Sequence, residues 1–303
     1  MATFSFEDAQ DTGSFSFEDA QTPETFSFEE GLDTPTRTFG GTVKDVGVSA
    51  YKGMLGLQNS LVGLADIVVP GNLGGVVSSG LESLTGLTPE DATKQMSAKY
   101  SPAQQEANRK VEEAEGFLGK ARAMVQNPST IGHSLIESTP STAAGGVMGR
   151  GFMVVGKVPG LLASAAGEGL VGAGGAHEQI RQESPTGDVT PLQTGAAILS
   201  GMGTGAVNLA SGGLSQKLGF GDIDTMLTTG MRDVVGKGGA KAVTGRVTGG
   251  TVTEGLEETL QSGQEQAWQN AALGKPLGEG VGSAMGQGMV VGVAMGAGAN
   301  VAV

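Results

Sequence analysis

The earliest clear pattern of apolar positions lies between residues 40 and 87, where glycines interrupt an otherwise apolar stretch. Within it, Leu57, Leu61 and Leu64 recur at intervals of three or four residues, the spacing that places side chains on one side of an α-helix. We therefore expect a helix in this segment.

A second helical pattern begins at Ser101-Pro-Ala-Gln104, a capping box with proline at the first helical position. It opens a charged run that continues to about Val125 and ends at Asn127-Pro128. Small and apolar residues recur along this run at helical spacing: Val111, Ala114, Leu118 and Ala121. The pattern predicts one amphipathic surface helix.

A third helix is expected between residues 251 and 276. Thr251 and Glu254 form a capping box, and Gly274 with Pro276 closes the helix. One face carries Leu256, Leu260 and Ala267. The segment also carries four carboxylates: Glu254, Glu257, Glu258 and Glu265. Because no histidine and no second carboxylate-bearing helix is in reach, we interpret them as a solvated face rather than as a catalytic or di-metal set.

Three later stretches are almost free of charge. Residues 138–170 contain only Arg150, Lys157 and Glu168, whereas residues 189–216 and 280–303 contain no charged side chain. Each stretch is long enough to cross a hydrocarbon layer, which takes about 20 residues as a helix. Since leucine, isoleucine and phenylalanine are scarce, we do not expect stable constitutive insertion. We expect helices around 139–175, 190–216 and 279–303.

Glycines four residues apart recur in these stretches. Candidate helix-packing residues are Gly278, Gly282, Gly286, Gly288, Gly292 and Gly296. Three earlier pairs have the same spacing: Gly145 and Gly149, Gly156 and Gly160, Gly201 and Gly205. In a helix this spacing forms a smooth groove that a second helix can approach closely, although each glycine costs about 1 kcal/mol of helix stability relative to alanine. The pattern predicts helices that pack in an oligomer or a bilayer; the alternative is chance spacing at this glycine content.

The first 42 residues differ from the rest of the chain because they are acidic, with Arg37 as their one basic residue. They repeat a short motif three times: Thr3-Phe-Ser-Phe-Glu-Asp-Ala-Gln10, Ser14-Phe-Ser-Phe-Glu-Asp-Ala-Gln21 and Thr25-Phe-Ser-Phe-Glu-Glu-Gly31. We expect a disordered tail whose motifs dock a partner with added avidity. The docking candidates are Phe4, Phe6, Glu7, Phe15, Phe17, Glu18, Phe26, Phe28 and Glu29. A solvated tail without a partner, or a processing site at Ser-Phe-Glu, fits the same residues.

Composition narrows the functional classes. Glycine supplies 54 of 303 residues and aromatic residues supply 4%, so little bulk is available for a tightly packed core. The chain has no cysteine, which removes disulfides, thiol catalysis and cysteine-ligated zinc. A net charge of −13 argues against a general nucleic-acid-binding surface. We therefore expect a non-enzymatic protein without cofactors or metal ions.

Weaker motifs do not change this picture. Gly201-Met-Gly-Thr-Gly lacks the last glycine of the dinucleotide fingerprint, and His133 and His177 lack partners at metal-ligand spacing. His177-Glu178 is interpreted as a polar turn. One basic cluster either faces lipid head groups or DNA or is a solvated loop; it contains Arg232, Lys237, Lys241 and Arg246.

The segment from 250 to 300 resembles one found in large internal virion proteins of tailed bacteriophages. The similar residues are Glu254-Gly-Leu-Glu-Glu-Thr-Leu-Gln-Ser-Gly-Gln-Glu-Gln-Ala267, then Gln269-Asn-Ala-Ala-Leu-Gly-Lys-Pro276, then Glu279-Gly-Val-Gly282 and a helix rich in glycine, alanine and methionine. The resemblance implies a protein that is packaged in the capsid and expelled ahead of the DNA to help form a conduit across the host envelope. Larger members carry hydrolase modules, and this chain has no recognisable one.

These observations predict an all-α protein in three regions: a disordered tail over 1–42, an apolar segment with an amphipathic helix over 43–128, and a loosely packed Gly/Ala-rich helical region over 129–303. The expected function is that of an ejection protein located in the virion interior and then in the host envelope. Its expected partners are other virion proteins, the host membrane, further copies of itself and DNA in transit. The alternatives are a soluble virion scaffold or adaptor, and the N-terminal part of a longer polyprotein.

Overall fold

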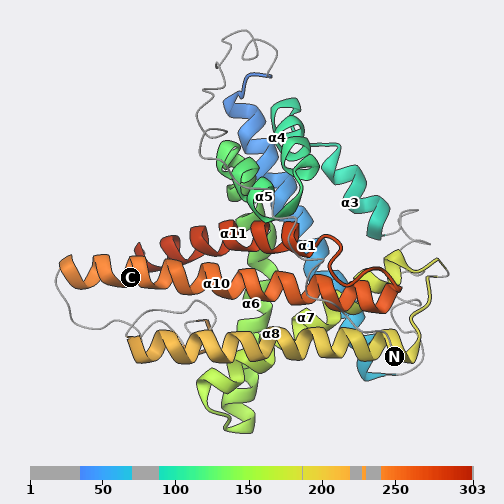
Figure 1. Cartoon of the computed structure of the whole chain (residues 1–303), viewed down its shortest axis with the longest axis vertical. Helices are drawn as coiled ribbons and strands as arrows, with labels where there is room; N and C mark the ends of the chain where they lie inside the picture. The colour runs from blue at the N-terminus through green and yellow to red at the C-terminus, as the bar shows by residue number, and fades with distance from the viewer. Residues whose placement is uncertain (1–34, 70–88, 186, 219–226, 230–239, 302–303) are drawn as a thin grey trace, which may run out of the picture. The chain divides into compact units, whose positions relative to one another are not determined.

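The computed structural model describes residues 35–69, 89–185, 187–218, 227–229 and 240–301. Within the compact unit Thr36–Val303, the described residues form helices and no strand, which confirms the all-α fold (Figure 1). The helices are α1 (Phe39–Val68), α3 (Pro89–Ser97), α4 (Pro102–Glu113), α5 (Gly116–Gln126), α6 (Pro128–Gly156), α7 (Gly160–Glu183), α8 (Pro191–Leu218), α10 (Ala240–Leu273) and α11 (Val281–Val301).

Helix α1 begins inside the expected N-terminal tail. The Thr38 hydroxyl caps the helix by accepting a hydrogen bond from the Gly41 amide at 3.1 Å. The first turn of α1 therefore belongs to the segment 1–42 that was assigned to the tail. The helix then runs through the whole leucine pattern of residues 57–64 and ends at Val68.

The expected single helix after Ser101 is two helices. Ser101 caps α4 by accepting from the Gln104 amide at 3.3 Å, which confirms the predicted N-cap. The reciprocal bond of a capping box is absent, because the Ser101 amide donates to Asp45 Oδ1 at 2.6 Å and not to the Gln104 side chain. The helix stops at Glu113 because Ala114 and Glu115 adopt extended conformations. Gly116, the first residue of α5, has a positive φ of 68°, a conformation that favours glycine. Lys120 of α5 then turns back and donates to the terminal α4 carbonyl oxygen atoms of Val111 and Glu112, at 2.6 and 3.1 Å. Carbonyl groups in the last turn of a helix have no partner within that helix, and the Lys120 ammonium group provides one for these two.

Replacing Ser101 with alanine removes the cap of α4. We expect the free energy of unfolding to fall by at least about 1 kcal/mol, the usual value of an N-cap hydroxyl, because the substitution also removes the bond that the Ser101 hydroxyl donates to buried Asp45 at 2.6 Å. Urea denaturation of Ser101→Ala and Ser101→Asn measures this. Asparagine restores the cap, so equal losses in both variants would show that the cap contributes nothing.

The uncharged stretch expected as a helix around 139–175 also divides in two. Lys157 adopts a left-handed conformation with a φ of 53°, and Pro159 follows, so α6 ends at Gly156 and α7 starts at Gly160. The pair formed by Gly156 and Gly160 therefore flanks a break and does not form a groove on one helix.

Helix α10 begins well before the predicted capping box, at Ala240, so Thr251 lies inside the helix and not at its N-terminus. Its predicted C-terminal end is confirmed, since α10 stops at Leu273 and Gly274 takes a positive φ of 67°. The Asn270 side chain spans the turn to α11 by donating to the carbonyl oxygen atoms of Leu277 and Glu279, at 3.1 and 2.7 Å.

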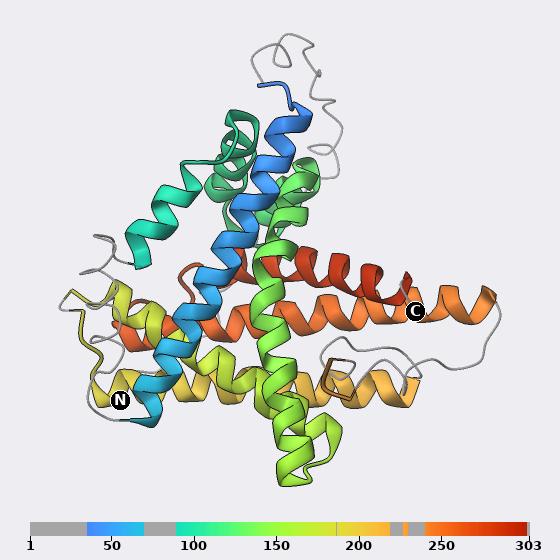
Figure 2. The same ribbon diagram turned by 180° about the vertical axis from the view of Figure 1, so that it is seen from behind.

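Helix α7 lies at the centre of the packing and contacts α1, α6 and α8. Helix α10 packs between α8 and α11, and the three run side by side in Figure 1. Figure 2, from behind, shows α1 and α6 crossing this layer. Helix α5 contacts α11 and joins the N-terminal helices to the C-terminal hairpin.

Candidate functional site

Helix α7 is packed on three sides through glycine. On the α1 side, Gly63 meets Gly174 so closely that a Cβ on either residue would clash with a backbone carbonyl oxygen. On the α6 side, a Cβ on Gly149 would lie 2.7 Å from the Ala163 carbonyl oxygen. On the α8 side, a Cβ on Gly205 would lie 2.6 Å from the Ala165 carbonyl oxygen. The absence of side chains, rather than their interdigitation, sets the distance between these helices.

The C-terminal glycines occupy two faces of α11. Gly288, Gly292 and Gly296 lie against α10, where a Cβ would meet the backbone of Glu258, Glu254 and Gly250 respectively. Gly286 lies against the Phe117 carbonyl oxygen of α5, and a Cβ on Gly282 would be 3.4 Å from the Phe117 amide nitrogen.

Gly278 does not belong to this set, and its expected packing role is wrong. It lies in the turn between α10 and α11, and a Cβ there would meet nothing within 4 Å. The reason is that α11 starts only at Val281, after Gly280 takes a positive φ of 70°. The four-residue spacing of Gly278 and Gly282 suggested that both lie on one helix, but Gly278 lies in the turn before it.

The carboxylates expected on a solvated face of α10 point inward instead. Glu254 and Glu257 are buried, whereas Leu256 and Leu260 are more than half exposed. Glu257 accepts hydrogen bonds from Ser211 of α8 and, at 3.0 Å, from Gln261. The expectation failed because α10 turns its glycines and polar residues toward α8 and α11, and this leaves the leucines outside.

Glu258 and Glu265 are partly buried in the same region. Thr204 of α8 donates to Glu265 Oε1 at 2.7 Å, and Gln264 Nε2 donates to Thr204 Oγ1 at 3.0 Å. Burial, together with the neighbouring charge of Glu265, raises the pKa of Glu258 to about 7. Burial also raises the pKa of Glu265, and the bond from Thr204 partly opposes that rise.

A second polar cluster joins α1 to α6. The Ser49 hydroxyl lies 2.8 Å from His133 Nδ1 and 2.6 Å from the Tyr100 hydroxyl, which in turn donates to Glu137 Oε1 at 2.5 Å. Lys52 pairs with Glu137 at 3.1 Å. Burial lowers the pKa of His133 and raises that of Tyr100. Serine beside histidine suits nucleophilic chemistry, but Ser49 has no exposed surface for a substrate to reach, so the cluster links the helices.

His177 was predicted to lie in a polar turn, and this prediction is wrong. The residue lies within α7 and is buried, at 4% exposure. Burial lowers its pKa. It lines a pocket of about 440 Å³, named here the polar pocket, between the end of α1, the end of α7 and the start of α8. The lining is completed by Asp66, Ile67, Arg181, Asp188, Val189, Pro191, Thr194, Gly195 and Ile198.

Large apolar side chains lie mainly on the outside of this molecule. Within the described ranges, alanine supplies most of the buried apolar residues, and the larger ones are Val48, Tyr100, Met124, Val171, Ile180 and Val291. Many more large apolar side chains are exposed, among them Phe39, Val155 and Leu192, each at more than 80%. The buried set includes many polar residues, such as Asn208, Gln104 and Asn270. This distribution is the reverse of an ordinary globular protein.

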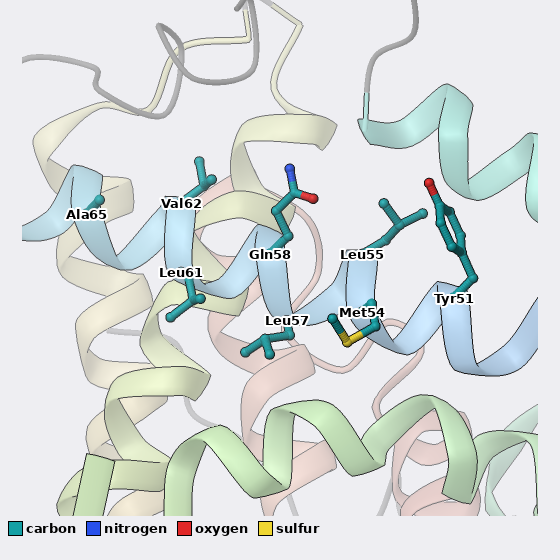
Figure 3. Close-up of a pocket in the computed structure, with 8 residues that line it drawn as sticks. All are labelled: Tyr51, Met54, Leu55, Leu57, Gln58, Leu61, Val62 and Ala65. Carbon is teal, nitrogen blue, oxygen red and sulfur yellow. The ribbon is translucent and has the colours of Figure 1, made fainter. Parts of the chain in front are cut away.

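Two apolar surfaces of the molecule are accessible to solvent. The first, the α1 stripe, consists of Phe39, Val43, Val46, Met54, Leu61 and Val68. Part of it borders a hollow of about 420 Å³, where Met54, Leu57 and Leu61 extend from one side of the helix and Leu55, Gln58 and Val62 from the other (Figure 3).

The second surface, the α7 groove, is a hollow of about 610 Å³. Its lining is Leu64, Ile67, Val68, Phe152, Leu162, Ala165, Ala166, Gly169, Leu170, Ala173, Ile198, Gly201, Met202, Gly205, Ala206 and Leu209. Glycine and alanine form much of the lining from α7 and α8, so the glycine packing described above also shapes this groove. The groove was not predicted from the sequence, although the uncharged stretch 189–216 contributes one side.

Other expected sites lie outside the described residues. These include the docking phenylalanines and glutamates Phe4, Phe6, Glu7, Phe15, Phe17, Glu18, Phe26, Phe28 and Glu29, and the basic residues Arg232 and Lys237. Lys241 and Arg246 belong to α10, but their side chains are not described. In the described part of the chain, no group of three or more histidine and carboxylate side chains is arranged to hold a metal ion.

No helix in the described ranges combines the length and the hydropathy that crossing a membrane requires. Comparison with protein-family models, with curated protein sequences and with solved structures found no match.

Proposed function

We propose that this chain is a non-enzymatic internal virion protein of a tailed bacteriophage, expelled with the genome, and that it associates with the host envelope to help form a conduit for DNA. The observation that carries the proposal is the exposure of large apolar side chains around an interior of glycine, alanine and polar residues. Contiguous exposed apolar surface marks sites where proteins bind other proteins or membranes.

The free energy of association favours such a role. Full transfer of an exposed valine, leucine or phenylalanine side chain out of water stabilises by about 1.5–3 kcal/mol. The α1 stripe alone offers six such side chains over a helix of 30 residues. The interior, by contrast, gains little from burial, because its contacts are made by glycine and alanine.

The resemblance to ejection proteins supports the same assignment. Its residues coincide with the α10–α11 hairpin, in which Gly288, Gly292 and Gly296 bring the two helices together. Close packing through glycine is a common way for helices to associate in lipid. The N-terminal Phe-Ser-Phe-Glu motifs are proposed to hold the chain to another virion protein before ejection.

Dye release from vesicles of phosphatidylethanolamine and phosphatidylglycerol tests the proposal with the full chain. We expect release by the natural sequence and at least several-fold slower release by the double variant Val43→Glu, Met54→Glu. Both positions are more than half exposed, so the new charges disturb association and not folding.

The matched control is Gln126→Glu with Gln287→Glu, which adds the same charge at two exposed polar positions and is expected to release dye like the natural chain. No release by the natural chain between pH 5 and pH 8 would contradict the proposal and favour the soluble adaptor.

A further inference from the structure

The α7 groove and the polar pocket adjoin each other. Ile67 of α1 and Ile198 of α8 line both of them, so an apolar hollow and a charged hollow share a wall. A ligand that fills both must be amphipathic, with a hydrocarbon part and a charged part only a few bonds apart.

The groove has a lining suited to hydrocarbon alone. Each of its lining residues is apolar or is glycine, and no lining side chain carries a hydrogen-bonding group. A polar ligand group placed there would lose its water without gaining a partner, which disfavours its binding. The volume, about 610 Å³, lies within the range of pockets that enclose small ligands.

The polar pocket presents both signs of charge. Arg181 lies on one side, held by Glu178, whose carboxylate accepts from Arg181 Nε at 2.7 Å and from Nη2 at 2.5 Å. The first turn of α8, with Pro191 and Thr194 in the lining, contributes the positive end of a helix of 28 residues. Asp66 and Asp188 provide negative charge in the same lining.

His177 is the second observation that points to a ligand. It is 4% exposed and lines the polar pocket, and its Nδ1 atom is buried without a hydrogen-bond partner. Its Nε2 atom makes only a long contact, 3.4 Å, with Thr194 Oγ1. Buried polar atoms are nearly always hydrogen-bonded, so a ring with one unsatisfied nitrogen and one long contact can still gain a hydrogen bond from a polar group in this pocket.

We propose that these two hollows form a phospholipid site, in which an acyl chain lies in the α7 groove and a zwitterionic head group occupies the polar pocket. The head-group phosphate lies by Arg181 and the first turn of α8, and its ammonium group lies by Asp66 and Asp188. The inference rests on the proposed function and deepens it, because it names the lipid that the folded chain recognises.

Calorimetric titration of the full chain with monomeric dihexanoyl phosphatidylethanolamine tests this site without a bilayer. We expect binding of one lipid per chain, and binding weaker by roughly tenfold or more for dihexanoyl phosphatidylglycerol, which lacks the ammonium group. Met202→Glu, which places a charge in the groove at a position 65% exposed, is expected to weaken binding by at least tenfold. Asp188→Asn is expected to weaken it several-fold and to reduce the preference for the ethanolamine lipid.

Met289→Glu on α11 is the control, since the same substitution is made there at an exposed methionine outside both hollows, and it is expected to bind like the natural chain. Absence of binding by the natural chain, equal binding of the two lipids, or unchanged binding by Met202→Glu would each overturn the site. If the natural chain still releases dye from vesicles in that case, the lipid site fails while the proposed function stands.

Discussion

Gly63→Ala is expected to lower the free energy of unfolding by about 2 kcal/mol, although alanine is the better helix former. A Cβ at this position would clash with the carbonyl oxygen of Gly174, and it would lie 3.0 Å from the carbonyl carbon and 3.1 Å from the Glu178 amide nitrogen. These are backbone atoms, so α1 and α7 must move apart. Overpacking of this kind typically costs about 1–3 kcal/mol, which outweighs a gain in helix propensity of about 1 kcal/mol.

Gly56→Ala on the same helix is the matched control. A Cβ there meets nothing within 4 Å, so the propensity gain stands alone and the variant is expected to be more stable by up to about 1 kcal/mol. Urea denaturation of both variants gives the two values. Stabilisation of similar size at Gly63 and Gly56 would contradict the glycine-mediated crossing of α1 and α7.

Glu258→Gln is expected to make stability less dependent on pH. The pKa of Glu258 is about 7 in the folded chain against an ordinary value of 4.5. The folded state therefore binds a proton more tightly than the unfolded state does, and this contribution to stability is complete below pH 4.5 and lost as the pH rises through 7. The shift corresponds to at most about 3 kcal/mol.

Measured by urea denaturation, the natural chain and Glu258→Gln should have similar stability at pH 5, and the variant should be more stable at pH 8. Glu112→Gln, at an exposed position of α4, should follow the natural chain throughout. His133 and His177 have lowered pKa values, so their contribution to stability increases with pH, opposite to that of Glu258. This contribution is the same in the natural chain and the variant, so it cancels when the two are compared. A constant difference between pH 5 and pH 8 would show that Glu258 is not buried as described.

The parts of the fold that follow from local chemistry could be predicted from the sequence. The all-α class, the cap at Ser101 and the end of α10 at Gly274 depend on residues close together in the chain. The break between α4 and α5 could not be predicted in the same way. It depends on Lys120 returning to the α4 carbonyl groups, and glycine at 116 permits but does not require the left-handed conformation.

The buried face of α10 shows a more general limit. An ordinary amphipathic helix would bury Leu256 and Leu260 and expose the glutamates, and this was the prediction. Here closest approach to α11 decides the orientation, and it is possible only where Gly288 and Gly292 face α10. The side of α10 beside those glycines carries Glu254 and Glu258, so the carboxylates are drawn inward and the leucines remain exposed.

The same inversion explains why the α7 groove and the polar pocket escaped prediction. Their lining combines four helices, and residues such as Ala166 and Gly169 carry no distinctive chemistry by themselves. His177 was considered as a possible metal ligand and was predicted to lie in a turn. An isolated polar pair in a sequence does not reveal that its helix, α7, is central to the fold.

Flotation of the natural chain with vesicles of phosphatidylethanolamine and phosphatidylglycerol tests most directly the central claim, that the exposed apolar surface is covered by lipid when the protein works. The account predicts that most of the protein rises with the vesicles in a density gradient and remains at the bottom without them. A chain that stays at the bottom in both gradients, as a monomer that unfolds in one cooperative step, would contradict it.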